Sequence, residues 1–240
     1  MKTIGLIGGM SFESTAVYYR IINEAVRERR GALHSAEIVL HSVDFQGIVD
    51  LQKAGRWDLA GERLGRVAKH LENAGASCAL ICTNTMHLVA GTVQSAVTVP
   101  VINIIDETAK ALKAAGKQRP LLLATRYTME HGFYTEQMAR NGLSAIVPEA
   151  DDREAVHDVI FQELCAGRIL NESRDRLFGI IEKAKTDGAD SVILGCTEIC
   201  LILDPDALPL PGFDSTAIHA NAAVDFALGE AMHTHPTLAA

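Results

Sequence analysis

The chain has 240 residues, of which 48% are hydrophobic and 22% are charged, and this is enough to bury a substantial core in one large or two small domains. Its formal net charge of −8 argues against a nucleic-acid-binding surface or a face for anionic membranes, because both need clustered Lys and Arg. This charge does not exclude a small anionic substrate, since one pocket can be locally positive.

Short apolar or β-branched runs alternate with longer helical patterns along the whole chain, which is typical of βαβ units and a parallel sheet. Strands are predicted at residues 4–8, 37–43, 79–82, 101–104, 121–124, 145–147 and 191–194. Helices are predicted at residues 13–29, 59–73, 107–115, 132–141, 153–165, 172–185 and 215–228. The pattern predicts an α/β fold.

The N-terminal apolar run is too short for a signal peptide or a membrane helix, so we expect a cytoplasmic protein. The five cysteines do not form the pattern of a disulfide framework, and reducing conditions leave their thiols available for chemistry.

An internal repeat links two parts of the chain. Residues 63–83 match residues 176–196 without a gap, at an offset of 113 residues (196 minus 83), and both copies contain a helical stretch, a glycine and an apolar strand. Thr83 is therefore the internal counterpart of Cys196, and Cys82 is the counterpart of Gly195. A weaker similarity relates residues 4–9 to residues 121–125.

The repeat predicts two pseudo-symmetric Rossmann-like α/β domains with parallel sheets, one formed by residues 1–98 plus 207–240 and the other by residues 99–206. Ligands of open parallel sheets bind beyond the carboxyl ends of the strands. We therefore expect the active site in a cleft between the domains, with Thr83 and Cys196 approaching one ligand from opposite sides.

Several other site types are disfavoured by spacing. The turn at residues 8–11 has neither the P-loop ending nor the G-x-G-x-x-G spacing of dinucleotide sites. Cysteines four apart on a strand, such as Cys78 and Cys82, are about 13 Å apart. This is too far to share one zinc ion, whose bonds to sulfur are about 2.3 Å long. His87 and His219 are better explained as structural hydrogen-bonding residues than as ligands or acid–base groups.

Five strings in a fixed order resemble the aspartate/glutamate/hydantoin racemase superfamily, and together they extend over essentially the whole chain. They are GGMSFEST at residues 8–15, ICTNTMH at 81–87, LLLATRYTM at 121–129, ILGCTEI at 193–199 and FDSTAIH at 213–219.

This resemblance implies a homodimeric racemase that uses neither pyridoxal phosphate nor a metal, in which two cysteines face each other between two domains. The second cysteine motif is intact at Cys196, but Thr83 stands where the family usually has its first cysteine. In this respect the chain is similar to a subset close to an enterobacterial L-aspartate/glutamate-specific racemase. The implied activity is abstraction and return of the α-proton of aspartate or glutamate.

Proton removal from an α-carbon needs a base on one face and a proton donor on the other. We expect Cys196 to be the base, with its thiolate favoured by backbone N–H groups and a following helix N-terminus. Thr83 is a poor base without a partner, so we expect it to relay a proton or hold a water. The alternative is Cys82, but adjacent strand residues face opposite ways, and the repeat register favours Thr83.

The candidate substrate-binding residues combine turn and helix-start positions with matches to the family. They are Met10, Ser11, Gln52, Asn84, Thr85, Thr125, Arg126, Thr128 and Thr197. Backbone N–H groups at residues 8–11 and the hydroxyl and amide groups suit carboxylates, although each threonine is equally explained as a helix cap. Arg126 is a candidate partner for the distal carboxylate, and Arg168 is a weaker one.

Two alternatives to an acidic-amino-acid racemase remain open. The first is another enzyme of the superfamily: a broad-specificity racemase, a maleate-isomerase-like enzyme or a one-cysteine malonate decarboxylase. The second is a non-catalytic amino-acid-binding module, in which the missing cysteine marks a loss of activity.

Overall fold

Two parallel sheets organise the computed structural model, which describes residues 1–230, and its contacts divide these residues into two units. The first unit contains residues 1–104 and 219–230, and the second contains residues 105–218. The predicted division differs, because it assigned 99–104 to the second domain and 207–218 to the first. The chain leaves the first unit just after strand β4 (Val101–Ile102) and returns to it within helix α10 (Ser215–Leu228).

The first unit contains a four-stranded parallel sheet in the order β2-β1-β3-β4. Strand β1 (Ile4–Gly8) lies between β2 (Ile38–Ser42) and β3 (Cys78–Ile81), and Ile4 aligns with Ile38 on one side and Cys78 on the other. All residues of β1 and β3 are buried, as expected for central parallel strands covered by helices on both faces.

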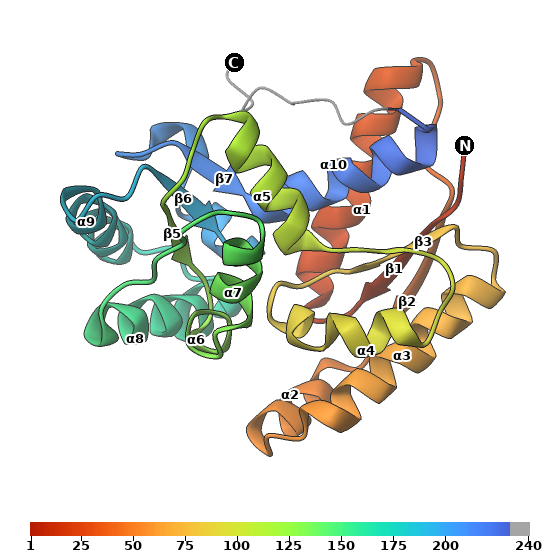
Figure 1. Ribbon diagram of the computed structural model, residues 1–240, viewed down its shortest axis with the longest axis horizontal. Coiled ribbons are helices and arrows are strands. Elements are labelled where there is room, and N and C mark those ends of the chain that lie inside the picture. Colours follow the sequence, from red (N-terminus) through yellow and green to blue (C-terminus); the bar gives the residue numbers. More distant parts are fainter. Residues whose placement is uncertain (231–240) are drawn as a thin grey trace. The chain divides into compact units, whose positions relative to one another are not determined.

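Alternate residues of the central strands enter two separate apolar clusters. Ile7 and Ile81 pack with α3 (Trp57–Asn73) and α4 (Ala90–Ser95), whereas Leu6 and Leu80 pack with α1 (Phe12–Arg30) and α10. Figure 1 shows α3 and α4 on one side of these strands and α1 and α10 on the other. The period of two along each strand therefore decides which helices a side chain contacts.

The second unit repeats this strand order. Strands β5 (Pro120–Leu123), β6 (Ser191–Leu194) and β7 (Gly212–Asp214) are parallel neighbours in that order. The strand predicted at residues 145–147 is reduced to one parallel bridge between Ile146 and Leu121. This segment lies beside β5 as β2 lies beside β1, so the two sheets have equivalent layouts.

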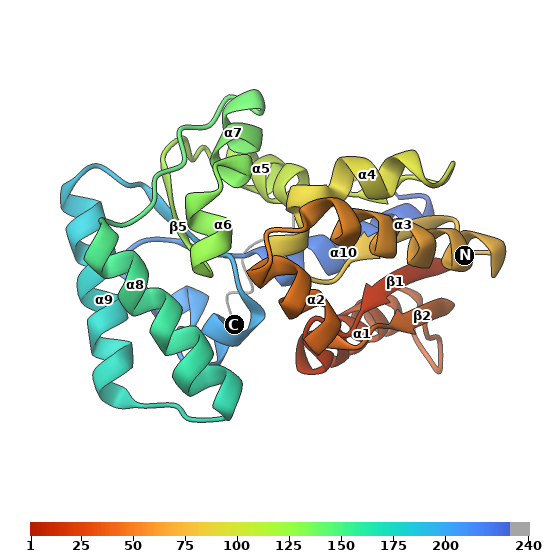
Figure 2. The same ribbon diagram turned by 90° about the horizontal axis from the view of Figure 1, so that it is seen from below.

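The second unit is covered by α5 (Ile104–Ala114), α6 (Arg126–Glu130), α7 (Phe133–Arg140), α8 (Ala150–Asp158) and α9 (Asn171–Thr186). Figure 2 shows α8 and α9 side by side, and Lys183 of α9 pairs with Asp152 of α8 at 2.9 Å. The single helix predicted at residues 153–165 is instead α8, a π-helical turn at Val159–Glu163 and a 3-10 turn at Leu164–Ala166.

The internal repeat is confirmed by the positions of its elements. Helix α3 ends at Asn73 and α9 at Thr186, and the following strands end at Ile81 and Leu194, so each pair keeps the offset of 113 residues (186 minus 73; 194 minus 81). The glycines between helix and strand, Gly75 and Gly188, have φ values of +94° and +92°. Glycine adopts this backbone conformation more easily than other residues, which explains its place in both copies.

Several short elements were not predicted. They are α2 (Phe45–Lys53), α4, α6, β7 and the 3-10 helices η1 (Thr85–Val89), η4 (Thr197–Leu201) and η5 (Pro205–Ala207). Each has nine residues or fewer, so its hydrophobic pattern is too short to show a clear period. Within residues 1–230, no helix combines the length and apolar character needed to cross a membrane.

A buried polar network joins α1, α10 and β4 inside the first unit. His219 of α10 donates from Nε2 to the Ile102 carbonyl at 2.8 Å and accepts at Nδ1 from the Tyr18 hydroxyl at 2.8 Å. Both side chains are fully buried. Burial, with a smaller effect of the neighbouring His87, lowers the pKa of His219 from 6.5 to about 3.

This pKa makes folding depend on pH. Between pH 6.5 and about 3, His219 binds a proton in the unfolded chain but not in the folded chain. The stability that is present above pH 6.5 is therefore lost as the pH falls through this range. We predict that His219 contributes up to about 1.4 kcal/mol per pH unit to the free energy of unfolding in this range. Urea unfolding at pH 6.5 and about 5 should show a steeper loss in wild type than in His219→Gln; equal slopes contradict the assignment.

Candidate active site

The first group of candidate residues lies at one edge of the first sheet, and we call it the Thr83 half-site: Met10, Ser11, Thr83, Asn84 and Thr85. Strands β1 and β3 are parallel neighbours, and the Cys82 N–H donates to the Ile7 carbonyl at 3.0 Å just beyond β3. Residues that follow the two strands therefore leave the sheet at the same carboxyl edge, which is where ligands of such sheets bind.

Thr83 is the first partly accessible residue after a fully buried strand. Residues 78–82 are all buried and Thr83 is intermediate, and the same sequence of burial is found for residues 191–195 and Cys196. The Cys82 side chain packs in the apolar cluster with α1 and α10, where burial raises its pKa strongly. This placement favours Thr83 over Cys82 as the residue that meets a ligand.

The turn after β1 uses much of its own hydrogen-bonding capacity. Gly9 has a φ of +89°, and its N–H donates to the Thr15 hydroxyl at 2.8 Å. The Ser11 hydroxyl accepts from the Ser14 N–H at 3.2 Å and so caps α1. The Gly9 N–H is therefore already used within the turn, Met10 is buried beside it, and carboxylate binding by the backbone of this turn stays a prediction.

Gln52 is brought to the Thr83 half-site by helix α2. Its Nε2 lies 3.1 Å from the Met86 sulfur in η1, the 3-10 helix whose N-cap is Asn84. Asn84 and Thr85 are both buried at the start of this helix. The contact brings Gln52 to the helix that begins with Asn84 and Thr85, although Gln52 and Met86 are 34 residues apart in the sequence.

The second group lies at the equivalent edge of the second sheet, and we call it the Cys196 half-site: Thr125, Thr128, Cys196, Thr197 and Glu198. Cys196 follows β6, and Thr125 follows the neighbouring β5. The Thr125 and Thr128 hydroxyls lie 3.1 Å apart.

Gly195, the residue before Cys196, packs closely against the end of β5. Its N–H donates to the Leu123 carbonyl at 2.8 Å. A Cβ at this position would lie 2.9 Å from Leu122 Cδ1 and 3.0 Å from Ala124 Cβ. A larger residue would have to push aside the end of the Leu122 side chain and crowd Ala124, so close packing favours glycine before Cys196.

The Cys196 thiol is held by a carboxylate. Its Sγ donates to Glu198 Oε2 at 2.9 Å, and the Thr197 hydroxyl donates to the same oxygen at 2.9 Å. Burial and then the charge of Glu198 raise the Cys196 pKa well above its ordinary value. The expected stabilisation of the thiolate is therefore wrong for this arrangement, because the helix that follows is a five-residue 3-10 helix and the nearest charge is negative.

Glu198 was missed as a site residue, although it lies inside the string at residues 193–199. The available signal was a carboxylate two residues after the cysteine, within reach of the thiol once the chain turns at the end of the strand. A carboxylate that accepts a thiol hydrogen bond is a candidate proton acceptor for that thiol.

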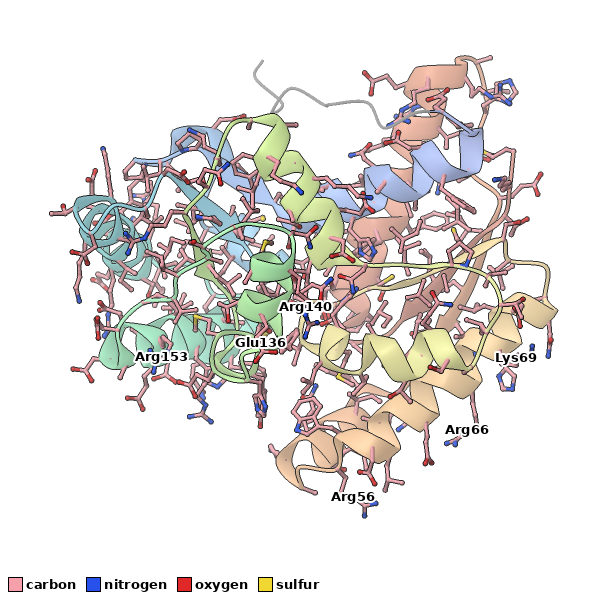
Figure 3. All side chains as sticks on the ribbon, in the orientation of Figure 1. Arg56, Arg66, Lys69, Glu136, Arg140 and Arg153 are labelled. Carbon is pink, nitrogen blue, oxygen red and sulfur yellow. The ribbon has the colours of Figure 1, made fainter. Side chains whose placement is uncertain are left out.

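The two arginines that are candidates for binding the distal carboxylate are Arg126 and Arg168. The Arg126 side chain is exposed, and its backbone N–H faces His157 Nδ1 at 3.4 Å. The Arg168 guanidinium donates to the Gln162 carbonyl within its own segment. Figure 3 shows Arg66 and Lys69 projecting from α3 away from the strands of the first unit. Recognition of a distal carboxylate by Arg126 or Arg168 stays a prediction.

No group of three His, Cys, Asp or Glu side chains in residues 1–230 is placed to hold a metal ion. Cys78 and Cys82 both lie in the apolar core of the first unit, where burial raises their pKa values.

Comparison with known proteins finds similarities that extend over most of the chain. The sequence profile of the Asp/Glu/Hydantoin racemase family matches residues 7–223. A broad specificity amino-acid racemase, RacX of Bacillus subtilis, is 25% identical over 226 residues, which are 92% of this chain and 96% of that protein.

Solved structures agree over nearly the whole chain. A proposed Asp/Glu racemase from Yersinia pestis is 47% identical with a TM-score of 0.91, covering 95% of this chain and 100% of that one. An aspartate racemase homologue, PH1733 of Pyrococcus horikoshii, is 34% identical with a TM-score of 0.85, covering 95% of this chain and 100% of that one. The predicted α/β fold class is confirmed by these similarities.

The Cys196–Glu198 contact predicts a measurable change in thiol ionisation. Glu198→Gln removes the negative charge beside the sulfur, so the pKa of Cys196 should fall toward its ordinary value. We expect faster alkylation of Cys196 at neutral pH, measured by peptide mass analysis in a Cys165→Ser background that removes the exposed thiol. Glu198→Asp, which keeps the charge, is the matched control. Slower alkylation of the glutamine variant would contradict this electrostatic assignment.

Proposed function

The chain belongs to the Asp/Glu/hydantoin racemase family and is an amino-acid racemase, and from this premise we propose that it interconverts the enantiomers of aspartate or glutamate without a cofactor. In the proposed reaction Cys196 removes the α-proton on one face of the substrate. Thr83, or a water that it holds, returns a proton on the other face.

The observation that carries this proposal is the hydrogen bond from the Cys196 thiol to Glu198 at a strand end. Because the thiol pKa is raised, the resting group is the neutral thiol, and it becomes a base when Glu198 takes its proton. The thiolate then accepts the α-proton from the substrate. Glu198 thereby supplies the activation that we first attributed to backbone N–H groups.

Thr83 is assigned to the return of the proton on the opposite face. An aliphatic hydroxyl is too weak an acid and base to exchange protons as readily as a thiol, so we propose that it passes on a proton delivered to it or orients a water. Its position as the repeat counterpart of Cys196, with the same burial at the strand end, supports this assignment.

The substrate class is supported by the relatives. The relative at 47% identity is named as a proposed Asp/Glu racemase and the relative at 34% as an aspartate racemase homologue, whereas the relative at 25% is described as broad in specificity. We propose that Met10, Ser11, Gln52, Asn84 and Thr85 hold the substrate on the Thr83 side. Thr125, Arg126, Thr128 and Thr197 hold it on the Cys196 side.

Thermodynamics limits how far the difference between the two half-sites can affect the rates in the two directions. Racemisation has an equilibrium constant of about one, so kcat/KM is the same in the two directions whatever residues are used. Exchange of the α-proton with solvent carries no such restriction. We assign Cys196 to the face of the L-enantiomer, by analogy with the family.

We predict that α-hydrogen exchange in D₂O is faster for L- than for D-substrate, because the better base faces the L-enantiomer. NMR of α-hydrogen loss, with L- and D-aspartate, L- and D-glutamate and a panel of neutral amino acids, measures base placement and specificity together. Equal exchange from both enantiomers of every substrate contradicts the assignment, and exchange of neutral amino acids as well points to broad specificity.

The variants Cys196→Ala and Glu198→Gln test the catalytic pair. We expect Cys196→Ala to lose L-substrate exchange by at least about 10³-fold, and Glu198→Gln to lose about 10²-fold or more even though its thiol ionises more easily. A protein that is stabilised by aspartate or glutamate but shows no exchange as wild type would instead be a binding module.

A further inference from the structure

His87 is a buried imidazole with both ring nitrogens engaged, four residues after Thr83. Its Nδ1 lies 2.9 Å from the Thr83 carbonyl oxygen. Its Nε2 accepts from the Ile104 N–H at 3.1 Å, and only 5% of the residue is exposed. The ring therefore connects the loop that carries Thr83 to the first residue of α5, where the chain leaves the first unit.

These partners determine the tautomer of the ring. A backbone N–H can only donate, so Nε2 of His87 must be the acceptor. The proton is therefore on Nδ1, which donates to the Thr83 carbonyl. His219, whose ring centre lies 5.6 Å away in an edge-to-face arrangement, has the opposite tautomer, with Nε2 donating to Ile102.

The second unit makes an equivalent connection with different chemistry. Cys200 follows His87 by the repeat offset of 113 residues (200 minus 87), and it likewise lies four residues after Cys196. The Cys200 thiol hydrogen-bonds to Asp214 at the end of β7, as His87 bonds to the backbone just after β4. Asp214 in turn accepts the N–H groups of Thr216 and Ala217 at 2.8 and 3.1 Å, in the first turn of α10.

In each unit, the residue four positions after the half-site residue is hydrogen-bonded near the start of the helix that follows the final strand of that sheet. These residues are His87 before α5 and Cys200 before α10. In the first unit this residue reaches the backbone of the reacting position itself, because His87 contacts the Thr83 carbonyl. Thr83 also closes a tight turn, with its N–H donating to the Ile81 carbonyl at 2.7 Å. The direction of its side chain therefore depends on this carbonyl being held.

We propose that His87 is a positioning residue for the reaction: its Nδ1–H fixes the Thr83 carbonyl and thereby aims the Thr83 hydroxyl at the substrate. The proposal rests on the proposed function, because it assigns His87 to the proton-donating half-site. His87 itself contacts no reacting atom. Its removal affects reprotonation on the Thr83 face and leaves proton abstraction by Cys196 in place.

Two substitutions separate the two bonds of His87. In His87→Asn the side-chain amide reaches the place of Nδ1, so it keeps a donor for Thr83 and loses the contact to Ile104. In His87→Gln the longer amide reaches the place of Nε2, so it keeps an acceptor for Ile104 and loses the donor to Thr83. The pair removes one hydrogen bond each from the same buried site.

The measurement is α-hydrogen exchange of D- and L-substrate in D₂O, with D-exchange reporting the Thr83 face. We expect His87→Gln to lose D-exchange by about tenfold or more while L-exchange stays within about threefold of wild type, because misplacement of a reacting group is costly. We expect His87→Asn to keep D-exchange within about threefold. The control is Tyr18→Phe, which removes the buried hydrogen bond to His219 and leaves the His87–Thr83 contact in place. Both exchange rates should stay at the wild-type level.

Equal losses of D- and L-exchange in both His87 variants would overturn the proposal, since they indicate a structural role only. Absence of exchange in wild type would instead contradict the proposed function. Nitrogen-15 NMR of the wild-type imidazoles gives a second readout that does not need folded variants. It should show His87 protonated on Nδ1 and His219 on Nε2, and the reverse assignment for His87 would overturn the proposal.

Discussion

Parallel pairing of the central strands is the constraint on which the rest of the structure depends. The Cys82 N–H bonds to the Ile7 carbonyl in the first sheet, and the Gly195 N–H bonds to the Leu123 carbonyl in the second. These bonds continue the ladders to the carboxyl ends of β3 and β6, and there the buried backbone first becomes accessible. Because neighbouring strands end together, residues distant in sequence lie at the same sheet edge. The turn after β1 and Thr83 lie at the first edge, and Thr125 and Cys196 lie at the second.

At the end of β6, two groups have opposite effects on the ionisation of the Cys196 thiol. The chain offers a backbone N–H group, which favours a thiolate, and the charge of Glu198, which disfavours it. The carboxylate has the larger effect because it lies 2.9 Å from the sulfur in a desolvated place, where electrostatic effects are strong. The thiol is therefore favoured over the thiolate, and the carboxylate that we propose as its proton acceptor is already in contact with it.

The sequence was a good guide where the pattern is long or buried on both sides. Strands at residues 4–8 and 191–194 and the helix at 215–228 were predicted with the bounds found, and the repeat correctly related Gly75 to Gly188. Short elements such as β7, with three residues, and α2, with nine, have too few residues to show a clear period. The role of Glu198 and the direction of the Cys196 pKa shift depend on where one carboxylate oxygen lies, which no residue pattern states. The unit boundaries depend on which sheet α10 packs against, and this too is a tertiary property.

The placement of α10 also constrains how the chain is made. The apolar cluster that covers Leu6 and Leu80 is completed by Ala220, Ala223 and Val224, and the Lys2 N–H bonds to the Ala227 carbonyl. During synthesis the α3 face of the first sheet is therefore complete long before the other face, which has α1 but still lacks α10. More than 100 residues, including the whole second unit, must emerge in between. The nascent chain thus carries an apolar sheet face that α1 covers only in part until α10 is made, and partly covered apolar surface of this kind is prone to aggregation during folding.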